Sequence, residues 1–141
     1  MNMGQSNNKV FVVDDDQFTL SWYVQYIGSL GSYDVESFDN SLACLNNLTQ
    51  QPHVIFLDHR MDSLSGLEVL KKIKLFNPNI YVVFISGQDD IQVAVNALKL
   101  GAFDYIIKGE GDLQKIADVL KRISDIQNLL QNRPGGLLSS I

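Results

Sequence analysis

The chain has 141 residues, 45% hydrophobic and 19% charged, with a formal net charge of −5. This length suits one domain with an ordinary core, and the negative charge argues against nucleic acid as a partner. No apolar run approaches the roughly 20 residues that a membrane span needs, and residues 1–8 lack the apolar segment of a signal peptide. We therefore expect no membrane contact, and the single cysteine, Cys44, makes a cytoplasmic protein the default.

The first half of the chain alternates apolar runs with helical patterns. Residues 9–13 form a short apolar run that predicts a strand, and 17–30 suit a helix whose buried face is ambiguous because apolar residues nearly encircle it. Weak alternation over 33–38 indicates an outer strand, and leucines at threefold spacing predict a short helix over 41–50. Residues 53–57, of which four in a row are apolar, predict a strand buried on both faces.

The second half repeats this alternation. A capping-box pattern at Ser65 opens a predicted helix over 65–76. Strands are predicted over 80–85 and 103–107, separated by a helix from Asp90 to Leu100, and an amphipathic helix follows over 112–131.

Five strand–helix alternations predict an α/β fold, a five-stranded parallel doubly wound sheet with five helices. We expect one domain over residues 9–131. The polar segment 1–8 is expected to be a disordered tail, and 132–141, which contains Pro134 and two glycines, a flexible one.

Polar residues stand at the ends of four predicted strands: Asp14 and Asp15, Asp58, Ser86, and Lys108. In a doubly wound fold these ends converge on one crevice. Three carboxylates brought together need a cation to stay ionised, and oxygen ligands suit Mg²⁺. A lysine can neutralise the charge on the phosphoryl oxygens that the metal does not contact, and a hydroxyl can donate a hydrogen bond to them.

Each of these residues also has an ordinary structural interpretation. An Asp pair after a strand often caps a helix, and a lone Asp such as Asp58 often lies in a turn. Ser86 beside Gly87 is a common turn pair, and Lys108 could be a solvated side chain. Function is favoured because all of them fall at the same edge of one alternating pattern.

From Lys9 to about Leu130 the chain resembles the receiver domain of two-component response regulators. The resemblance rests on four motifs: Val12-Val13-Asp14-Asp15-Asp16, Leu57-Asp58-x-x-Met61-x-x-x-x-Gly66, Ile85-Ser86-Gly87 and Gly101-Ala102-x-Asp104-Tyr105-x-x-Lys108. It implies a flavodoxin-like fold of receiver type and a phosphoprotein in a phosphorelay. The phosphoryl donor would be a sensor histidine kinase or a histidine phosphotransfer protein. The domain would catalyse its own modification and would not be a turnover enzyme.

The resemblance also implies a role for each matching residue. Asp58 would be the phosphoacceptor. Asp14, Asp15 and Asp58, with the backbone carbonyl of Arg60, would hold Mg²⁺, Asp15 more directly than Asp14.

Three further residues take roles from the same resemblance. Ser86 would hydrogen-bond the phosphoryl group, and Lys108 would pair with it. Ser86 and Tyr105 would form the switch, the aromatic ring turning inward when the serine moves. The altered surface over residues 90–130 would contact an output partner or form a homodimer.

The chain departs from the family pattern at two positions. Asp62 replaces the usual proline after the loop methionine and adds negative charge near the pocket. Gly109 replaces the usual proline after the lysine, so we expect a trans peptide or a loop held by other contacts. In the family that the chain resembles, the positions of Arg60 and Gln88 tune the lifetime of the phosphorylated aspartate, and these two residues predict slow to moderate autodephosphorylation.

A rival hypothesis is a phosphorylation-independent interaction module with a vestigial acidic pocket, which Asp62 and Gly109 favour slightly. His53 and His59 invite a metal or catalytic interpretation, but His59 should point away from Asp58 if the segment is extended. A dehalogenase-like phosphatase would have Asp at position 60, and a cobalamin-binding domain would have His there. This chain has Arg60, so both classes are set aside.

Overall fold

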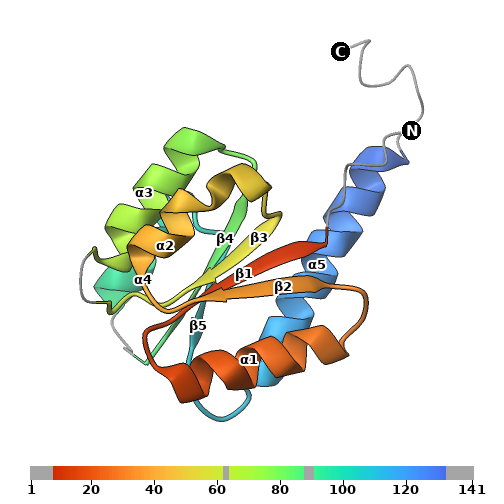
Figure 1. The fold of residues 1–141 in the computed structure, drawn as a ribbon. Coiled ribbons are helices and arrows are strands. Elements are labelled where there is room, and N and C mark those ends of the chain that lie inside the picture. The colour runs from red at the N-terminus through yellow and green to blue at the C-terminus, as the bar shows by residue number, and fades with distance from the viewer. Residues whose placement is uncertain (1–7, 62–63, 88–90, 133–141) are drawn as a thin grey trace.

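The computed structural model of the chain describes residues 8–61, 64–87 and 91–132. Asp62, Gln88 and Asp90 lie outside these ranges, as do the two expected tails apart from Asn8 and Asn132. The described part forms one parallel five-stranded sheet in the order β2-β1-β3-β4-β5 with helices on both faces (Figure 1). The predicted doubly wound fold is therefore confirmed.

The strands lie within a residue of their predicted positions. Their bounds are β1 Lys9–Val13, β2 Asp34–Phe38, β3 Val54–Leu57, β4 Tyr81–Ser86 and β5 Asp104–Ile107. All four residues of β3 are buried because the strand has neighbours on both sides and helices on both faces. The outer strand β2 is mostly accessible, which explains its weak apolar pattern.

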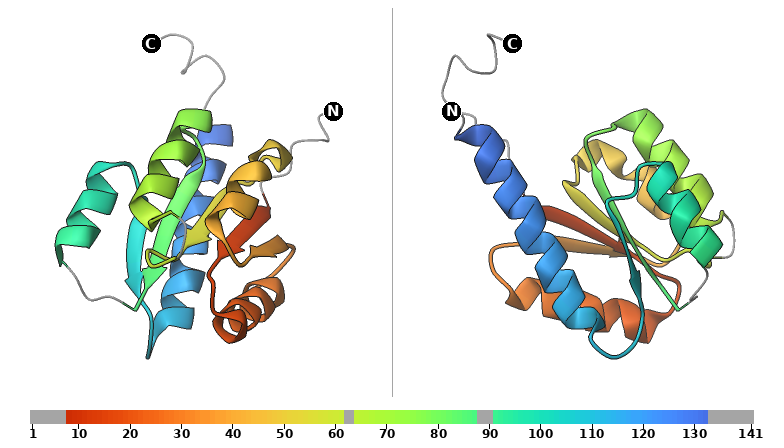
Figure 2. Two further views of the ribbon diagram at one scale, coloured as in Figure 1. Left: turned by 60° about the vertical axis from the view of Figure 1, so that its left-hand side comes forward. Right: turned by 180° about the vertical axis from the view of Figure 1, so that it is seen from behind.

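The helices form two layers, which Figure 2 shows from two further sides. Their bounds are α1 Gln17–Ser29, α2 Ser41–Asn46, α3 Gly66–Phe76, α4 Ile91–Lys99 and α5 Asp112–Gln131. Alternate residues of β1 point to opposite faces. Val10 and Val12 pack with residues of α1 and α5, whereas Phe11 and Val13 pack with residues of α2, α3 and α4. The core is thus divided by the sheet.

One helix differs from the sequence prediction, and in a second the structure shows which face is buried. The predicted helix over 41–50 is split into α2 and a short 3₁₀ turn at Leu48–Gln50. The Asn47 side chain donates a 2.7 Å hydrogen bond to the carbonyl of Ala43, a side-chain-to-backbone bond that competes with regular helix. In α1, the buried residues are Leu20, Tyr23 and Ile27.

Strand register brings the carboxyl ends of the central strands to one edge. Val13 of β1 pairs with Leu57 of β3, Leu57 pairs with Phe84 of β4, and Ser86 pairs with Ile107 of β5. The residues that follow these pairs therefore meet. No helix in the described ranges has the length and apolar character to cross a bilayer.

Candidate functional site

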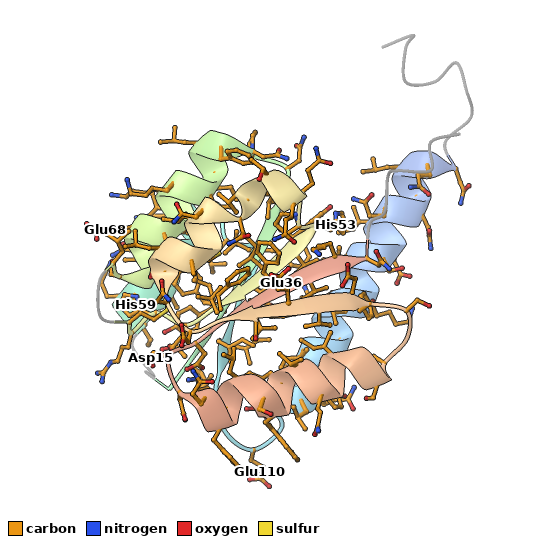
Figure 3. All side chains as sticks on the ribbon, in the orientation of Figure 1. Asp15, Glu36, His53, His59, Glu68 and Glu110 are labelled. Carbon is orange, nitrogen blue, oxygen red and sulfur yellow. The ribbon has the colours of Figure 1, made fainter. Side chains whose placement is uncertain are left out.

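Three carboxylates gather at the carboxyl edge of the sheet. Asp14 and Asp15 follow β1, and Asp58 follows the neighbouring strand β3. One oxygen from each of the three lies within 4.8 Å of the others. Asp14 and Asp58 are almost fully buried, at 2% and 6% exposure, whereas Asp15 is exposed (Figure 3 labels it at this edge). The cluster is therefore partly open to solvent.

The helix that follows β1 does not use these two acids as its cap. Asp16 caps α1, because its carboxylate accepts hydrogen bonds from the Phe18 N–H at 3.2 Å and the Thr19 hydroxyl at 2.7 Å. Asp14 in turn accepts the Asp16 N–H at 2.9 Å, which fixes its carboxylate. The capping interpretation of Asp14 and Asp15 is therefore wrong, and both acids keep oxygen atoms for the cluster.

Lys108 supplies the positive charge. Its ammonium nitrogen lies 2.7 Å from Asp14 Oδ2 and 3.3 Å from Asp58 Oδ2. Its backbone N–H donates to the Ser86 carbonyl at 2.9 Å, which continues the pairing of β5 with β4. Burial disfavours the charged amine, but the Asp14 hydrogen bond and the two carboxylate charges outweigh burial and raise the pKa of Lys108. Lys108 therefore stays positively charged beside the two acids.

Asp58 follows β3, the middle strand of the sheet. Burial raises the pKa of its carboxyl group, an effect that the attraction of Lys108 opposes and the charge of Asp14 reinforces. Its Oδ1 accepts the backbone N–H of Arg60 at 3.3 Å, and its backbone N–H donates to Val13 at 3.0 Å. A buried carboxylate beside a lysine can react with an anionic group, because the positive charge of the lysine offsets the repulsion between the two.

A close backbone approach supports the Asp58 loop. A Cβ atom added to Gly66 would lie 2.7 Å from the Cα of His59, 2.8 Å from Phe84 Cε2 and 3.0 Å from the Asp58 carbonyl oxygen. Gly66 also donates its N–H to the His59 carbonyl at 2.9 Å. Glycine is required at this first position of α3 by space, and Ser65 caps the helix as predicted through the Glu68 N–H.

The two predicted switch residues lie on adjacent strands. Ser86 ends β4 and is fully buried. Tyr105 of β5 pairs in register with Phe84 of β4, and the two rings stack with centroids 5.8 Å apart and planes 11° apart. Tyr105 is half-buried and packs against the core.

This donor set fits a small hard cation, because carboxylate oxygens are the ligands that Mg²⁺ prefers. Neither His53 nor His59 belongs to the cluster. The family model described as response regulator receiver domain matches residues 10–121.

The chain belongs to this family.

Known proteins agree with this assignment. TmoT, a response regulator protein of Ectopseudomonas mendocina, is 35% identical over 76% of this chain and 49% of its own length. The transcriptional regulator NtrC of Escherichia coli is 33% identical over 88% of this chain and 26% of its own. The chain therefore spans half or less of these relatives. The BeF₃-activated receiver domain of DrrB superposes with a TM-score of 0.75 at 27% identity, over 83% of this chain and 97% of that one.

Receiver domains are signalling domains that work by phosphorylation, bind Mg²⁺ at an acidic pocket, and pair with histidine kinases and output domains. In this receiver, Asp14, Asp15, Asp58 and Lys108 come together. One contact near them, the hydrogen bond between Tyr23 and the first residue of α5, is not predicted by any pattern in the sequence.

Proposed function

We propose that this receiver takes a phosphoryl group from a phosphohistidine onto Asp58. Asp14, Asp15 and Asp58, with the backbone carbonyl of Arg60, would hold Mg²⁺. The observation that carries the proposal is the contact of Lys108 with Asp58, at 3.3 Å, inside a cluster of three carboxylates. A partly buried lysine that contacts two buried carboxylates supports a working phosphate site rather than a vestigial pocket.

The transfer is an in-line displacement at phosphorus. A carboxylate oxygen of Asp58 forms the new O–P bond while the N–P bond of the phosphohistidine breaks, and the imidazole nitrogen leaves with the electron pair. Asp58 needs no proton transfer to react because its ionised form is the nucleophile. The contribution of the protein is to hold this oxygen in position and to neutralise charge on the phosphoryl oxygens.

When bound, Mg²⁺ would neutralise the acids and the charge on the phosphoryl oxygens. Lys108 would then pair with the phosphoryl group, because a phosphorylated Asp58 places new negative charge next to its ammonium group. The Ser86 hydroxyl would donate to another phosphoryl oxygen. Asp14 stays fixed throughout by the Asp16 N–H.

The same residues supply a switch. Movement of Ser86 toward the phosphoryl group would change the space next to the half-buried Tyr105 ring, which stacks on Phe84. Two arrangements of this pair would convert a local charge change into a surface change. The mechanism is self-modification, in keeping with a signalling domain.

The surface that would respond is the face made by α4, β5 and α5. Ile91, Val95 and Leu98 are exposed apolar residues of α4, at 77%, 38% and 49%. On the neighbouring elements, Arg122 forms an ion pair with Asp104, so part of the charge on this face is used within the chain. We propose that the apolar side chains of α4 contact an output partner or a second copy of the chain.

The test is intact mass after incubation with acetyl phosphate, with and without Mg²⁺. Wild type should gain about 80 Da, the mass of one phosphoryl group, only with Mg²⁺. Asp58→Asn should gain nothing, whereas Asp125→Asn, an exposed acid of α5, should behave as wild type. If the mass of the wild type increases neither with acetyl phosphate nor with a phosphohistidine donor, the proposal is overturned. The phosphorylation-independent interaction module would then be the better account.

A further inference from the structure

Tyr23 connects α1 to the loop that follows Lys108. Its hydroxyl donates a 2.7 Å hydrogen bond to Asp112 Oδ2, across 89 residues of sequence. The same carboxylate oxygen accepts the backbone N–H of Gly109 at 3.1 Å, and the Asp112 N–H donates to the Gly109 carbonyl at 3.1 Å. Tyr23 is only 3% exposed. Figure 1 shows the loop between β5 and α5 passing beside α1.

Lys108 is therefore held on both sides along the backbone. Before it in the chain, β5 pairs with β4, and the Lys108 N–H reaches the Ser86 carbonyl at 2.9 Å. After it, the Gly109 peptide is held by Asp112, whose position Tyr23 secures. The flexible Lys108 side chain is therefore attached to a backbone segment that hydrogen bonds hold in place on both sides.

Glycine at 109 makes this arrangement possible. Gly109 has φ of 131°, in the region that favours glycine, and its N–H is the donor to Asp112. A proline has φ near −65° and no N–H, so it could neither adopt this backbone conformation nor donate a hydrogen bond to Asp112. The departure from the family pattern at 109 is thus matched by a hydrogen bond that the usual proline could not make.

We infer that Tyr23 is a positioning residue for phosphoryl transfer, acting through Asp112 and Gly109 to hold Lys108 beside Asp58. The inference rests on the proposed function. Burial and the hydrogen bond to Asp112 raise the pKa of Tyr23, so its hydroxyl keeps the proton that it donates. The alternative is that Tyr23 and Asp112 merely fasten α1 to α5, in which case their loss would lower stability and leave the rate unchanged.

The decisive variant is Tyr23→Phe, which keeps the buried ring and removes only the hydroxyl. Its control is Tyr26→Phe, a half-buried tyrosine of the same helix. The rate of Asp58 phosphorylation by acetyl phosphate at saturating Mg²⁺ should fall about tenfold in Tyr23→Phe, since a misplacement near 1 Å can cost about 10²-fold. It should not change in Tyr26→Phe.

Variants at Asp112 test the route. Asp112→Ala should slow phosphorylation as Tyr23→Phe does, and the double variant should be no slower than Asp112→Ala alone, because both changes break one connection. Asp112→Asn keeps a carbonyl oxygen for the same two donors and should retain most of the rate. Additive losses in the double variant would overturn the route through Asp112.

Two NMR signals test the inference without phosphorylation. In Tyr23→Phe, the Gly109 amide should exchange with solvent at least several-fold faster, and the ε-methylene resonance of Lys108 should move toward that of the exposed Lys99. If the wild type takes no phosphoryl group, the proposed function fails while these signals still report the position of Lys108. An unchanged Lys108 resonance in a folded Tyr23→Phe variant would overturn the inference.

Discussion

The ammonium nitrogen of Lys108 lies closer to Asp14 than to Asp58, at 2.7 Å against 3.3 Å. Asp14 is only 2% exposed, so its charge is compensated mainly from inside the protein. In the absence of Mg²⁺, Lys108 therefore stabilises the folded state by neutralising buried carboxylates. The contact with Asp14 also draws Lys108 away from Asp58, the proposed phosphoacceptor. A phosphoryl group on Asp58 would compete with Asp14 for the Lys108 ammonium.

Lys108→Met should destabilise the metal-free protein and make it more dependent on Mg²⁺. Leaving buried acids without a cation should cost about 3 kcal/mol, the low end for breaking a buried pair because Lys108 is partly exposed. Saturating Mg²⁺ should recover most of this loss and should bind more tightly to the variant than to wild type. Urea unfolding with and without Mg²⁺ measures both effects. Lys99→Met, at an exposed lysine, is the control, and equal stability of the two variants would contradict the prediction.

Gly66→Ala should destabilise the protein and slow phosphorylation of Asp58. The added methyl group would meet backbone atoms of His59 and Asp58 at 2.7 and 3.0 Å, and neither can move without shifting the loop. Overpacking of this kind costs about 1–3 kcal/mol. The matched control is Gly28→Ala in α1, where an added Cβ has no neighbour within 4 Å. Gly28→Ala should be neutral or stabilising in urea unfolding, and a neutral result for Gly66→Ala would refute the steric account.

The sheet and the acidic cluster could be predicted because their causes are local. Each buried strand is a short apolar run that stops at a polar residue, as Val54–Leu57 stops at Asp58. Parallel strands bring such ends to one edge whatever the loops between them do. Asp14 and Asp58 are close because they follow β1 and β3, which are adjacent strands of the sheet.

The contacts of α1 could not be predicted in this way. Apolar residues surround the whole helix, yet Phe18 and Trp22 are 80% and 52% exposed whereas Tyr23 is buried. The choice of face depends on α5, whose Asp112 is 89 residues away and accepts the Tyr23 hydroxyl. No local pattern records that pairing, because hydrogen-bond partners on different helices share no sequence period.

Cys44 should be inert in the folded protein. The residue is fully buried in α2, and burial raises the pKa of its thiol to about 12. Because the thiolate is the reactive form, iodoacetamide at a pH near the ordinary thiol value of about 8.5 should not modify the native protein. In urea the same cysteine should react fully, which is the internal control. Native labelling at the rate of a free thiol would show that α2 opens readily.

His53 should make stability depend on pH at the end of the sheet opposite the acidic cluster (Figure 3 labels His53 at the start of β3). Its ring meets Tyr81 edge-on, with centroids 5.3 Å apart. Within the described part of the chain, its buried Nε2 has no hydrogen-bond partner. Burial lowers the pKa of His53 below its ordinary value of 6.5.

The sign of the effect follows from which state binds the proton. With a lowered pKa in the folded protein, the unfolded chain takes up the proton first as the pH falls. The free energy of unfolding should therefore be flat above the ordinary histidine pKa of 6.5 and decrease as the pH falls from there toward the lower folded pKa. His53→Phe keeps an aromatic ring against Tyr81 and should remove this slope. Urea midpoints of both proteins across this window provide the measurement, and parallel slopes would contradict the assignment to His53.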